Sequence, residues 1–328
     1  MPTNLPPEYF EVERRYRAAE SVRERIACLE ELLSTVPKHK GTDRLRADLR
    51  RKLSRLRDES KARTSTSRHE SAFLIDKAGA GQVVVVGPPN TGKSALVAAL
   101  TNAAPEVSSS PFSTWTPTPG MMPFEDVQVQ LIDTPPLHSD FVQPELTDLI
   151  RRSDLILVVL DLQADPIRQL EDTMALLEAH YIFPDWRQDD PPDAQRASFK
   201  RLVVVANKAD DADSDELLEL FRQLIGEHWP VISASATTGR NLAQLRARVF
   251  ASLEVIRVYS KPPGRDPDLS APFVLKKGST VEELAGKIHQ DFRQHLLAAR
   301  VWGSADFDGQ MVARDHVLQD GDIVELRI

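Results

Sequence analysis

The chain has 328 residues, of which 41% are hydrophobic and 27% are charged, as in an ordinary soluble globular protein. This length predicts about two domains. The only cysteine, Cys28, excludes an intramolecular disulfide framework and favours a reducing compartment. No apolar run approaches the ~18 residues of a membrane span. We therefore expect a cytoplasmic protein with no membrane partner.

The formal net charge of −8 hides an asymmetry along the chain. Residues 1–70 contain 17 Lys and Arg against 12 Asp and Glu, whereas the whole chain contains 41 and 49. A basic segment attached to an acidic body indicates an anionic partner for that segment alone.

Residues 1–70 predict an antiparallel helical hairpin. Apolar side chains recur at spacings of three and four from Glu8 until residues 37–41 interrupt them, and Thr42 can cap a second helix. Lys and Arg are dense over residues 38–57. This basic region is either a solvated helix face or a docking surface for RNA phosphates, which need charge and no sequence code. It indicates no readout of a DNA sequence.

The next pattern is a phosphate-binding loop. Residues 87–94 form the sequence G-x-x-x-x-G-K-S between a β-branched run, 83–86, and a helical segment. Backbone N–H groups and the helix dipole then face an anion, Lys93 adds a positive charge, and the Ser94 hydroxyl can ligate Mg²⁺. The residues expected against the phosphates are Gly87, Pro89, Asn90, Thr91, Gly92, Lys93, Ser94 and Ala95.

Asp133 and the loop before its strand are expected to complete the phosphate and metal site. Asp133 follows the predicted strand 127–132 and can reach Mg²⁺ through a water molecule. Residues 111–120 form a loop with several hydroxyl groups, one of which can ligate Mg²⁺ only while a γ-phosphate is bound. Thr114 is our choice, with Ser113 and Thr116 as alternatives.

A second motif indicates which base is bound. Asn207-Lys208-Ala209-Asp210 directly follows the predicted strand 202–206. A carboxylate accepts two hydrogen bonds from the N1–H and 2-amino groups of guanine, and adenine lacks that donor pair. Asn207 can contact both the guanine edge and the phosphate loop, and the Lys208 stem can pack on the base. Asp210 therefore predicts GTP or GDP as the ligand.

A third loop can support the guanine. Residues 235–239 have the spacing S-A-x-x-G after the strand 229–232. Ser233-Ala234 is a nearby competitor, and we favour Ser235 and Ala236 because Gly239 then falls at the expected distance.

The alternation of strands and helices over residues 71–260 predicts an α/β fold, a doubly wound and mostly parallel sheet. Residues 181–199 are expected to form a long acidic insertion loop of unassigned role. Residues 261–272 are expected to be a linker, and 273–328 a small β-grasp domain. Its signals are a strand at 273–275, a capping box at Thr280 and Glu283 opening a helix through Phe292, and a final strand, 323–328.

These motifs resemble those of the Obg-related GTPases, most of all the developmentally regulated GTP-binding subgroup. The resemblance includes Phe112-Ser113-Thr114, Asp133-Thr134-Pro135 and the 37–42 turn, and residues 273–328 resemble a TGS domain. It implies Mg²⁺-dependent hydrolysis of GTP to GDP and phosphate. It also implies association with ribosomes or structured RNA through residues 38–57 and the TGS domain. The extra domain of that family has no room between residues 136 and 200.

Two positions depart from the family's third motif. Pro136 replaces a glycine whose N–H contacts the γ-phosphate, and Leu137 stands where Ras-like enzymes have the glutamine that orients water. In related GTPases a phosphate-loop asparagine helps to bind K⁺, which stands in for an arginine finger. Asn90 resembles that residue, although asparagine is also a common turn former. The catalytic residues implied are Lys93, Asn90 and Thr114.

Three functions remain open from the sequence. The first is a slow GTPase switch that docks on ribosomes or RNA. The second is a GTP-binding or GDP-binding module with little or no hydrolysis, because of Pro136 and Leu137. The third is a kinase or biosynthetic enzyme that uses GTP, which the terminal segments do not favour, since they resemble binding modules.

Overall fold

The computed structural model describes residues 7–18, 28–29, 31–33, 35–36, 47–49, 51–53, 72–101, 116–137, 142–188 and 196–327. The chain separates into two compact units, residues 1–72 and 73–328. None of the helices in the described segments is both long and apolar enough to cross a membrane.

The N-terminal unit is helical. Helix α1 spans Pro7–Ala18, and residues 28–29, 31–33, 35, 47–49 and 51–53 are also helical. Its small core agrees with the apolar spacing of the sequence and consists of Val12, Leu29, Leu32, Val36, Leu49 and Leu53. Cys28 is partly buried and packs against this core. Most of the basic region 38–57 lies outside the described residues.

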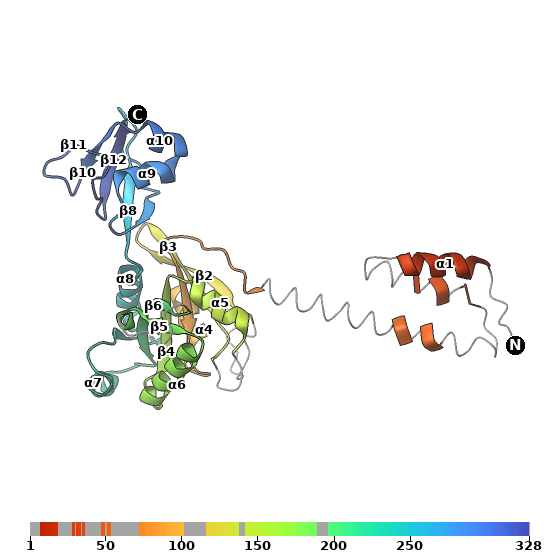
Figure 1. The fold of residues 1–328 in the computed structure, drawn as a ribbon. Coiled ribbons are helices and arrows are strands. Elements are labelled where there is room, and N and C mark those ends of the chain that lie inside the picture. The colour runs from red at the N-terminus through yellow and green to blue at the C-terminus, as the bar shows by residue number, and fades with distance from the viewer. Residues whose placement is uncertain are drawn as a thin grey trace. The chain divides into compact units, whose positions relative to one another are not determined.

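The second unit begins with a sheet in the order β2-β3-β1-β4-β6-β5, with β7 paired to β6 (Figure 1). Only β2 runs antiparallel to its neighbour β3, so the predicted mostly parallel sheet is confirmed. The strands are β1 (Gln82–Val86), β2 (Thr118–Phe124), β3 (Val127–Asp133), β4 (Leu155–Asp161), β5 (Ile182–Pro184), β6 (Ser198–Asn207) and β7 (Val231–Ser233).

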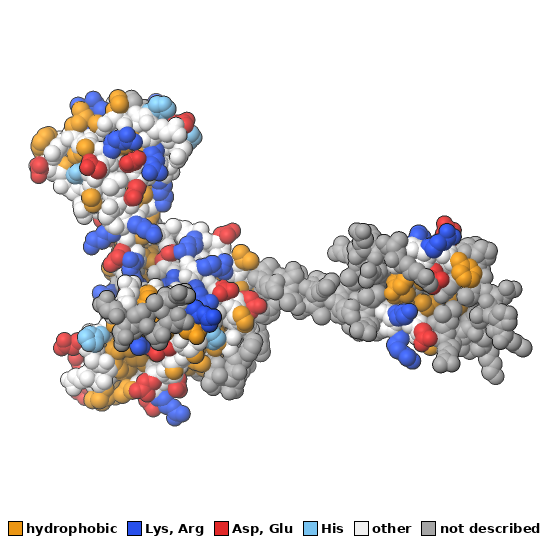
Figure 2. Space-filling model, in the orientation of Figure 1, with side chains coloured by type: hydrophobic (Ala, Val, Ile, Leu, Met, Phe, Trp, Pro, Cys, Tyr) orange, Lys and Arg blue, Asp and Glu red, His pale blue; other side chains and the backbone are white. Residues whose placement is uncertain are grey.

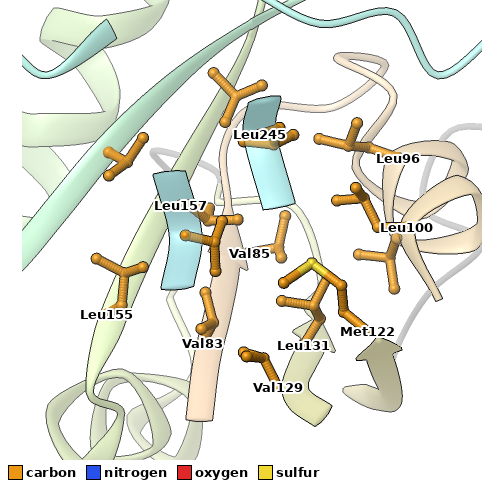
Figure 3. Packing of buried hydrophobic residues seen from close by; sticks show 14 of the residues in the cluster. Val83, Val85, Leu96, Leu100, Met122, Val129, Leu131, Leu155, Leu157 and Leu245 are labelled. Carbon is orange, nitrogen blue, oxygen red and sulfur yellow. The ribbon is translucent and has the colours of Figure 1, made fainter. Parts of the chain in front are cut away.

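Helices cover this sheet and bury its central strands on both faces. They are α4 (Lys93–Leu100), α5 (Pro144–Arg152), α6 (Pro166–Ala179), α7 (Asp213–Ile225) and α8 (Leu242–Leu253). Figure 3 shows Val83 and Val85 of β1 packed with Leu157 of β4 and with Leu96 and Leu100 of α4. All of β1 is buried, which explains its unbroken valine run. The phosphate loop therefore starts from a rigid strand.

Two predicted loops are partly wrong. Residues 182–184 form β5, 185–187 form a 3-10 helix, and 198–199 begin β6, so most of the described residues of the expected loop 181–199 belong to regular elements. Ile182 and Phe183 are buried, and that burial outweighs the acidic composition of the neighbouring residues. Residues 118–120 of the expected loop 111–120 belong to β2.

The C-terminal sheet has the order β11-β10-β12-β8-β9. Its elements are β8 (Val255–Ser260), β9 (Phe273–Lys276), α9 (Val281–Ile288), α10 (Gln290–His295), β10 (Ala298–Trp302), β11 (Gln310–Val312) and β12 (Asp322–Arg327). The capping box of Thr280 and Glu283 opens α9. The expected helix through Phe292 is instead two helices, because His289 is extended, with φ of −162°.

Strand β8 corrects one expected boundary. We expected residues up to 260 to belong to the first domain, but β8 pairs with β9 and β12. Ile256 and Val258 fill the core of the C-terminal sheet, so hydrophobic burial places this strand there.

Arg257 joins the two sheets of the second unit. Its guanidinium donates to Asp126 Oδ1 (2.9 Å) and Asp320 Oδ2 (2.7 Å) and also pairs with Glu125. It lies 5.2 Å from the ring centroid of Phe250. Because Glu125 and Asp126 form the β2–β3 turn, Arg257 fixes the C-terminal sheet to that turn.

Candidate nucleotide-binding site

The phosphate loop joins β1 to the N-terminus of α4 through glycines with special backbone angles. Gly87 has φ of +147°, and a Cβ there would lie 2.3 Å from the Val159 carbonyl oxygen. Gly92 has φ of +83°, and a Cβ there would lie 2.5 Å from Asn207 Nδ2. Both positions therefore require glycine, and the loop brings its backbone close to β4 and to the end of β6.

Lys93 is folded into this loop. Its Nζ donates to the carbonyl oxygens of Gly87 (3.0 Å) and Pro88 (2.7 Å), and the residue is only 6% exposed. Burial lowers the pKa of Lys93 to about 8, and the Asp133 carboxylate opposes that shift. The ammonium is thus held inside the loop by carbonyl oxygens, which phosphate oxygens can replace.

Ser94 and Asp133 meet beside the loop. The Ser94 hydroxyl donates to Asp133 Oδ2 at 2.5 Å, and Asp133 is 1% exposed. Burial raises the pKa of Asp133, while the hydrogen bond from Ser94 and the charge of Lys93 oppose the rise. Asp133 Oδ1 is buried and has no hydrogen-bond partner among the described residues.

This pair fits Mg²⁺, because a hydroxyl and a free carboxylate oxygen are ligands that the ion accepts. The described part of the chain contains no group of three His, Cys, Asp or Glu residues able to hold a metal ion. Mg²⁺ here would take its remaining ligands from water and phosphate, as it usually does. Thr114 and Ser113 lie outside the described residues, and Thr116 is exposed just before β2.

Asn207 connects the expected guanine loops to the phosphate loop. Its Nδ2 donates to the Thr91 carbonyl oxygen (2.8 Å), and its Oδ1 accepts from the Ala236 N–H (3.3 Å). Asn207 is 1% exposed at the end of β6. The buried side-chain amide of Asn207 thus links its own loop, 207–210, to the phosphate loop and to the loop 235–239.

The structure brings Ser235, rather than Ser233, to Asp210. The Ser235 hydroxyl donates to Asp210 Oδ1 at 2.5 Å and accepts from the Thr238 N–H at 3.0 Å. The Ser233 hydroxyl instead accepts from Asn241 Nδ2. Asp210 is exposed, so its carboxylate borders the open side of the site.

Two further residues of this site were missed in the sequence. Asp161 Oδ2 accepts from Lys208 Nζ (2.6 Å), and Gln163 Nε2 donates to the Lys208 carbonyl oxygen (3.0 Å). Lys208 has φ of +63°, which these contacts help to hold. A sequence signal existed, because Asp161 directly follows the apolar run 155–160, and ligand-binding side chains collect where parallel strands end.

The two departures from the family's third motif lie beside the phosphate loop. The Leu137 N–H donates to the Gly87 carbonyl oxygen (3.2 Å), and Leu137 is 4% exposed. Pro136 has no N–H to offer. The Leu137 N–H, which lies next to the phosphate loop, therefore already donates to a carbonyl oxygen of that loop.

Comparisons with known proteins agree with this architecture. A family model described as 50S ribosome-binding GTPase matches residues 82–185, and one described as TGS domain matches residues 256–328. An uncharacterized GTP-binding protein of Methanocaldococcus jannaschii is 29% identical over 366 residues, covering 94% of this chain and 93% of that protein. Developmentally-regulated G-protein 2 of Arabidopsis thaliana is 27% identical, covering 92% and 90%.

Both relatives carry residues that this chain lacks, since alignments of 366 and 365 positions exceed its 328 residues. Among solved structures, the YchF GTPase of Schizosaccharomyces pombe matches with a TM-score of 0.52 and 13% identity, covering 77% of this chain and 99% of that chain. That likeness supports the fold alone.

The chain is therefore a GTP-binding protein that joins a P-loop GTPase domain to a C-terminal TGS domain, and it is related over most of its length to the developmentally regulated GTP-binding proteins.

Proposed function

We propose that the protein is a slow, Mg²⁺-dependent GTPase that acts as a molecular switch. The observation that carries this proposal is the joining of two sites by Asn207. The buried ammonium of Lys93 supplies charge for phosphates, and the Asp210 carboxylate, oriented by Ser235, supplies acceptors for guanine. Asn207 ties both to one rigid frame through Thr91 and Ala236.

Mg²⁺, held by Ser94 and by Asp133 directly or through water, would neutralise charge on the phosphates. Lys93 would bind the phosphates from inside the loop. Thr114, with Ser113 and Thr116 as alternatives, would sense the γ-phosphate. Asn90 would contribute to a K⁺ site at the phosphates.

The second candidate is a GTP-binding module with little or no turnover. It is favoured by Pro136, which lacks an N–H, and by Leu137, whose N–H is already bonded to Gly87. Neither side chain can orient a water molecule for attack.

The terminal segments suggest the partner. The excess of Lys and Arg in residues 1–70, concentrated over 38–57, suits RNA phosphates. A model named for ribosome-binding GTPases matches the first domain, and the second is of the TGS type. We therefore propose that the switch acts on ribosomes or structured RNA in the cytoplasm.

Single-turnover hydrolysis separates the two candidates. Protein in excess is mixed with GTP and Mg²⁺, in KCl or in NaCl, and phosphate release is followed. The switch predicts release faster than that of the Lys93→Ala variant, and faster in K⁺. Release no faster than in Lys93→Ala, with GTP still bound by the wild type, would leave only the binding module.

A further inference from the structure

A groove lies at the end of the first sheet away from the nucleotide site. It has a volume of about 720 Å³ and is lined by residues just before β1 and β4, by the start of β6, and by the β9–α9 turn. The phosphate loop follows the other end of β1. Because these strands are parallel, the groove and the nucleotide site occupy opposite edges of the sheet.

The groove is rich in cations that lack carboxylate partners. Lys200 Nζ donates to the Ser153 carbonyl oxygen (2.8 Å), and Lys287 Nζ donates to the Val274 carbonyl oxygen. Lys276 and Lys277 are exposed, and neither side chain forms an ion pair within the segments that the structure describes. Figure 2 shows Lys and Arg side chains gathered where the two sheets meet.

Most carboxylates of the groove are already engaged. Asp154 pairs with Lys77 and accepts from the Gln82 N–H, and Glu254 pairs with Arg201 (2.5 Å). Glu283 accepts from the Thr280 N–H in the capping box. Asp185 is the remaining acidic residue of the lining. The N–H bond to Glu283 leaves its negative charge in place, so the four lysines of the lining face two carboxylates without an ion pair among the described residues, Asp185 and Glu283. The excess of positive charge favours an anionic ligand.

The exposure and flexibility of these lysine side chains favour the phosphate backbone of a nucleic acid as the ligand. Lys276, Lys277 and Lys287 are exposed on flexible stems, which suit a phosphate backbone held by charge rather than an enclosed small molecule.

We propose that Lys200, Lys276, Lys277 and Lys287 bind the phosphates of an RNA strand in this groove. The proposal rests on the RNA-binding part of the proposed function and gives it a place on the second unit, separate from residues 38–57. RNA bound there would contact both domains of the unit, because the groove takes residues from each.

The test uses the full chain and a fluorescent single-stranded RNA, with anisotropy measured at 50 to 300 mM KCl. In Lys276→Ala/Lys277→Ala, losing two contacts lowers the slope of log affinity against log salt by about 1.4 and the affinity at 100 mM about twentyfold. The matched control is Arg248→Ala/Arg265→Ala, two exposed arginines outside the groove, which should leave both unchanged. GTP titration and thermal unfolding of each variant check the fold.

Several outcomes overturn the proposal. If the lysine variant binds RNA with the affinity of the wild type, the groove is not the RNA site, and RNA binding is left to residues 38–57. If the wild type binds GTP but no RNA, both the groove proposal and the RNA role are wrong, and the GTPase proposal is unaffected. Tripolyphosphate binding that needs Lys276 and Lys277, without RNA binding, would make this a small-phosphate site. Tighter binding of DNA of the same sequence would also count against RNA.

Discussion

The side-chain amide of Asn207 donates a hydrogen bond to the main-chain carbonyl of Thr91 at 2.8 Å, across 116 positions of sequence. The same side chain accepts from the Ala236 N–H. The position of the guanine loops relative to the phosphates thus depends on one buried amide.

Asn207→Ala should therefore weaken GTP binding about 10- to 100-fold, since it leaves the Thr91 carbonyl and the Ala236 N–H unpaired, at about 1–3 kcal/mol. Calorimetric titration measures the loss. Gln163→Ala is the matched control, because that amide also donates to a carbonyl of the motif but is exposed. An equal loss in both variants would contradict the special role of Asn207.

The pKa of Lys93 predicts a pH dependence of nucleotide binding. Burial lowers this pKa from 10.5 to about 8, so the free protein loses the Lys93 proton as pH rises through about 8. Bound phosphate favours the ammonium. Affinity for GDP should therefore fall with rising pH above about 8. The cost of burying this charge in the folded state is present below pH 8 and is relieved as pH rises toward 10.5.

Lys93→Arg keeps a charge at every accessible pH, so its weaker binding should change less between pH 7 and 9. Titration of GDP at several pH values compares the two proteins, and ligand ionisation cancels in the comparison. Parallel pH profiles would show that Lys93 does not titrate in this range.

Asn90 offers a clean test of K⁺ dependence. It has φ of +64°, a conformation that glycine adopts without strain. Asn90→Gly therefore keeps the turn and removes the side-chain oxygen. We expect hydrolysis faster in K⁺ than in Na⁺ for the wild type and equal for the variant. A K⁺ preference that survives in Asn90→Gly would leave Asn90 as a turn residue only.

Arg257 is expected to stabilise the second unit through Asp126 and Asp320. Arg257→Ala removes charge-assisted hydrogen bonds to carboxylates that are partly exposed, so it should cost about 1 kcal/mol of unfolding free energy, whereas Arg257→Lys should cost less. The hydrogen bond from Arg257 lowers the pKa of Asp320 below its usual 3.8. This contribution is present above pH 3.8 and is lost as pH falls through the lowered pKa, so the difference between wild type and Arg257→Ala should shrink in acid. Denaturant unfolding at pH 7 and at a series of pH values below 3.8 measures it.

The sheet and the two nucleotide motifs could be predicted because their signals are local. A valine run before a glycine loop marks β1, and Asn207 follows a similar run in β6. The capping box likewise predicted the start of α9.

The expected boundary that was wrong and the site residues that were missed depend on contacts between residues far apart in the sequence. Strand β8 follows α8 after a single residue, Glu254, and its pairing with β9 and β12 places it in the C-terminal sheet. Asp161 contacts Lys208 because β4 and β6 are adjacent in the sheet. The sequences of two strands do not show that they are adjacent. The placement of Thr114 stays a prediction.

Guanine recognition by Asp210 is tested most directly by Asp210→Asn. Xanthine carries a carbonyl where guanine carries its 2-amino group, so an amide at this position suits xanthine and a carboxylate suits guanine. Calorimetric titration of wild type and variant with GTP, XTP and ATP gives the comparison. We expect the wild type to bind GTP at least about a hundredfold more tightly than ATP, and the variant to prefer XTP to GTP. Unchanged GTP affinity in Asp210→Asn, or equal affinity of the wild type for ATP, would contradict a guanine nucleotide bound at this site.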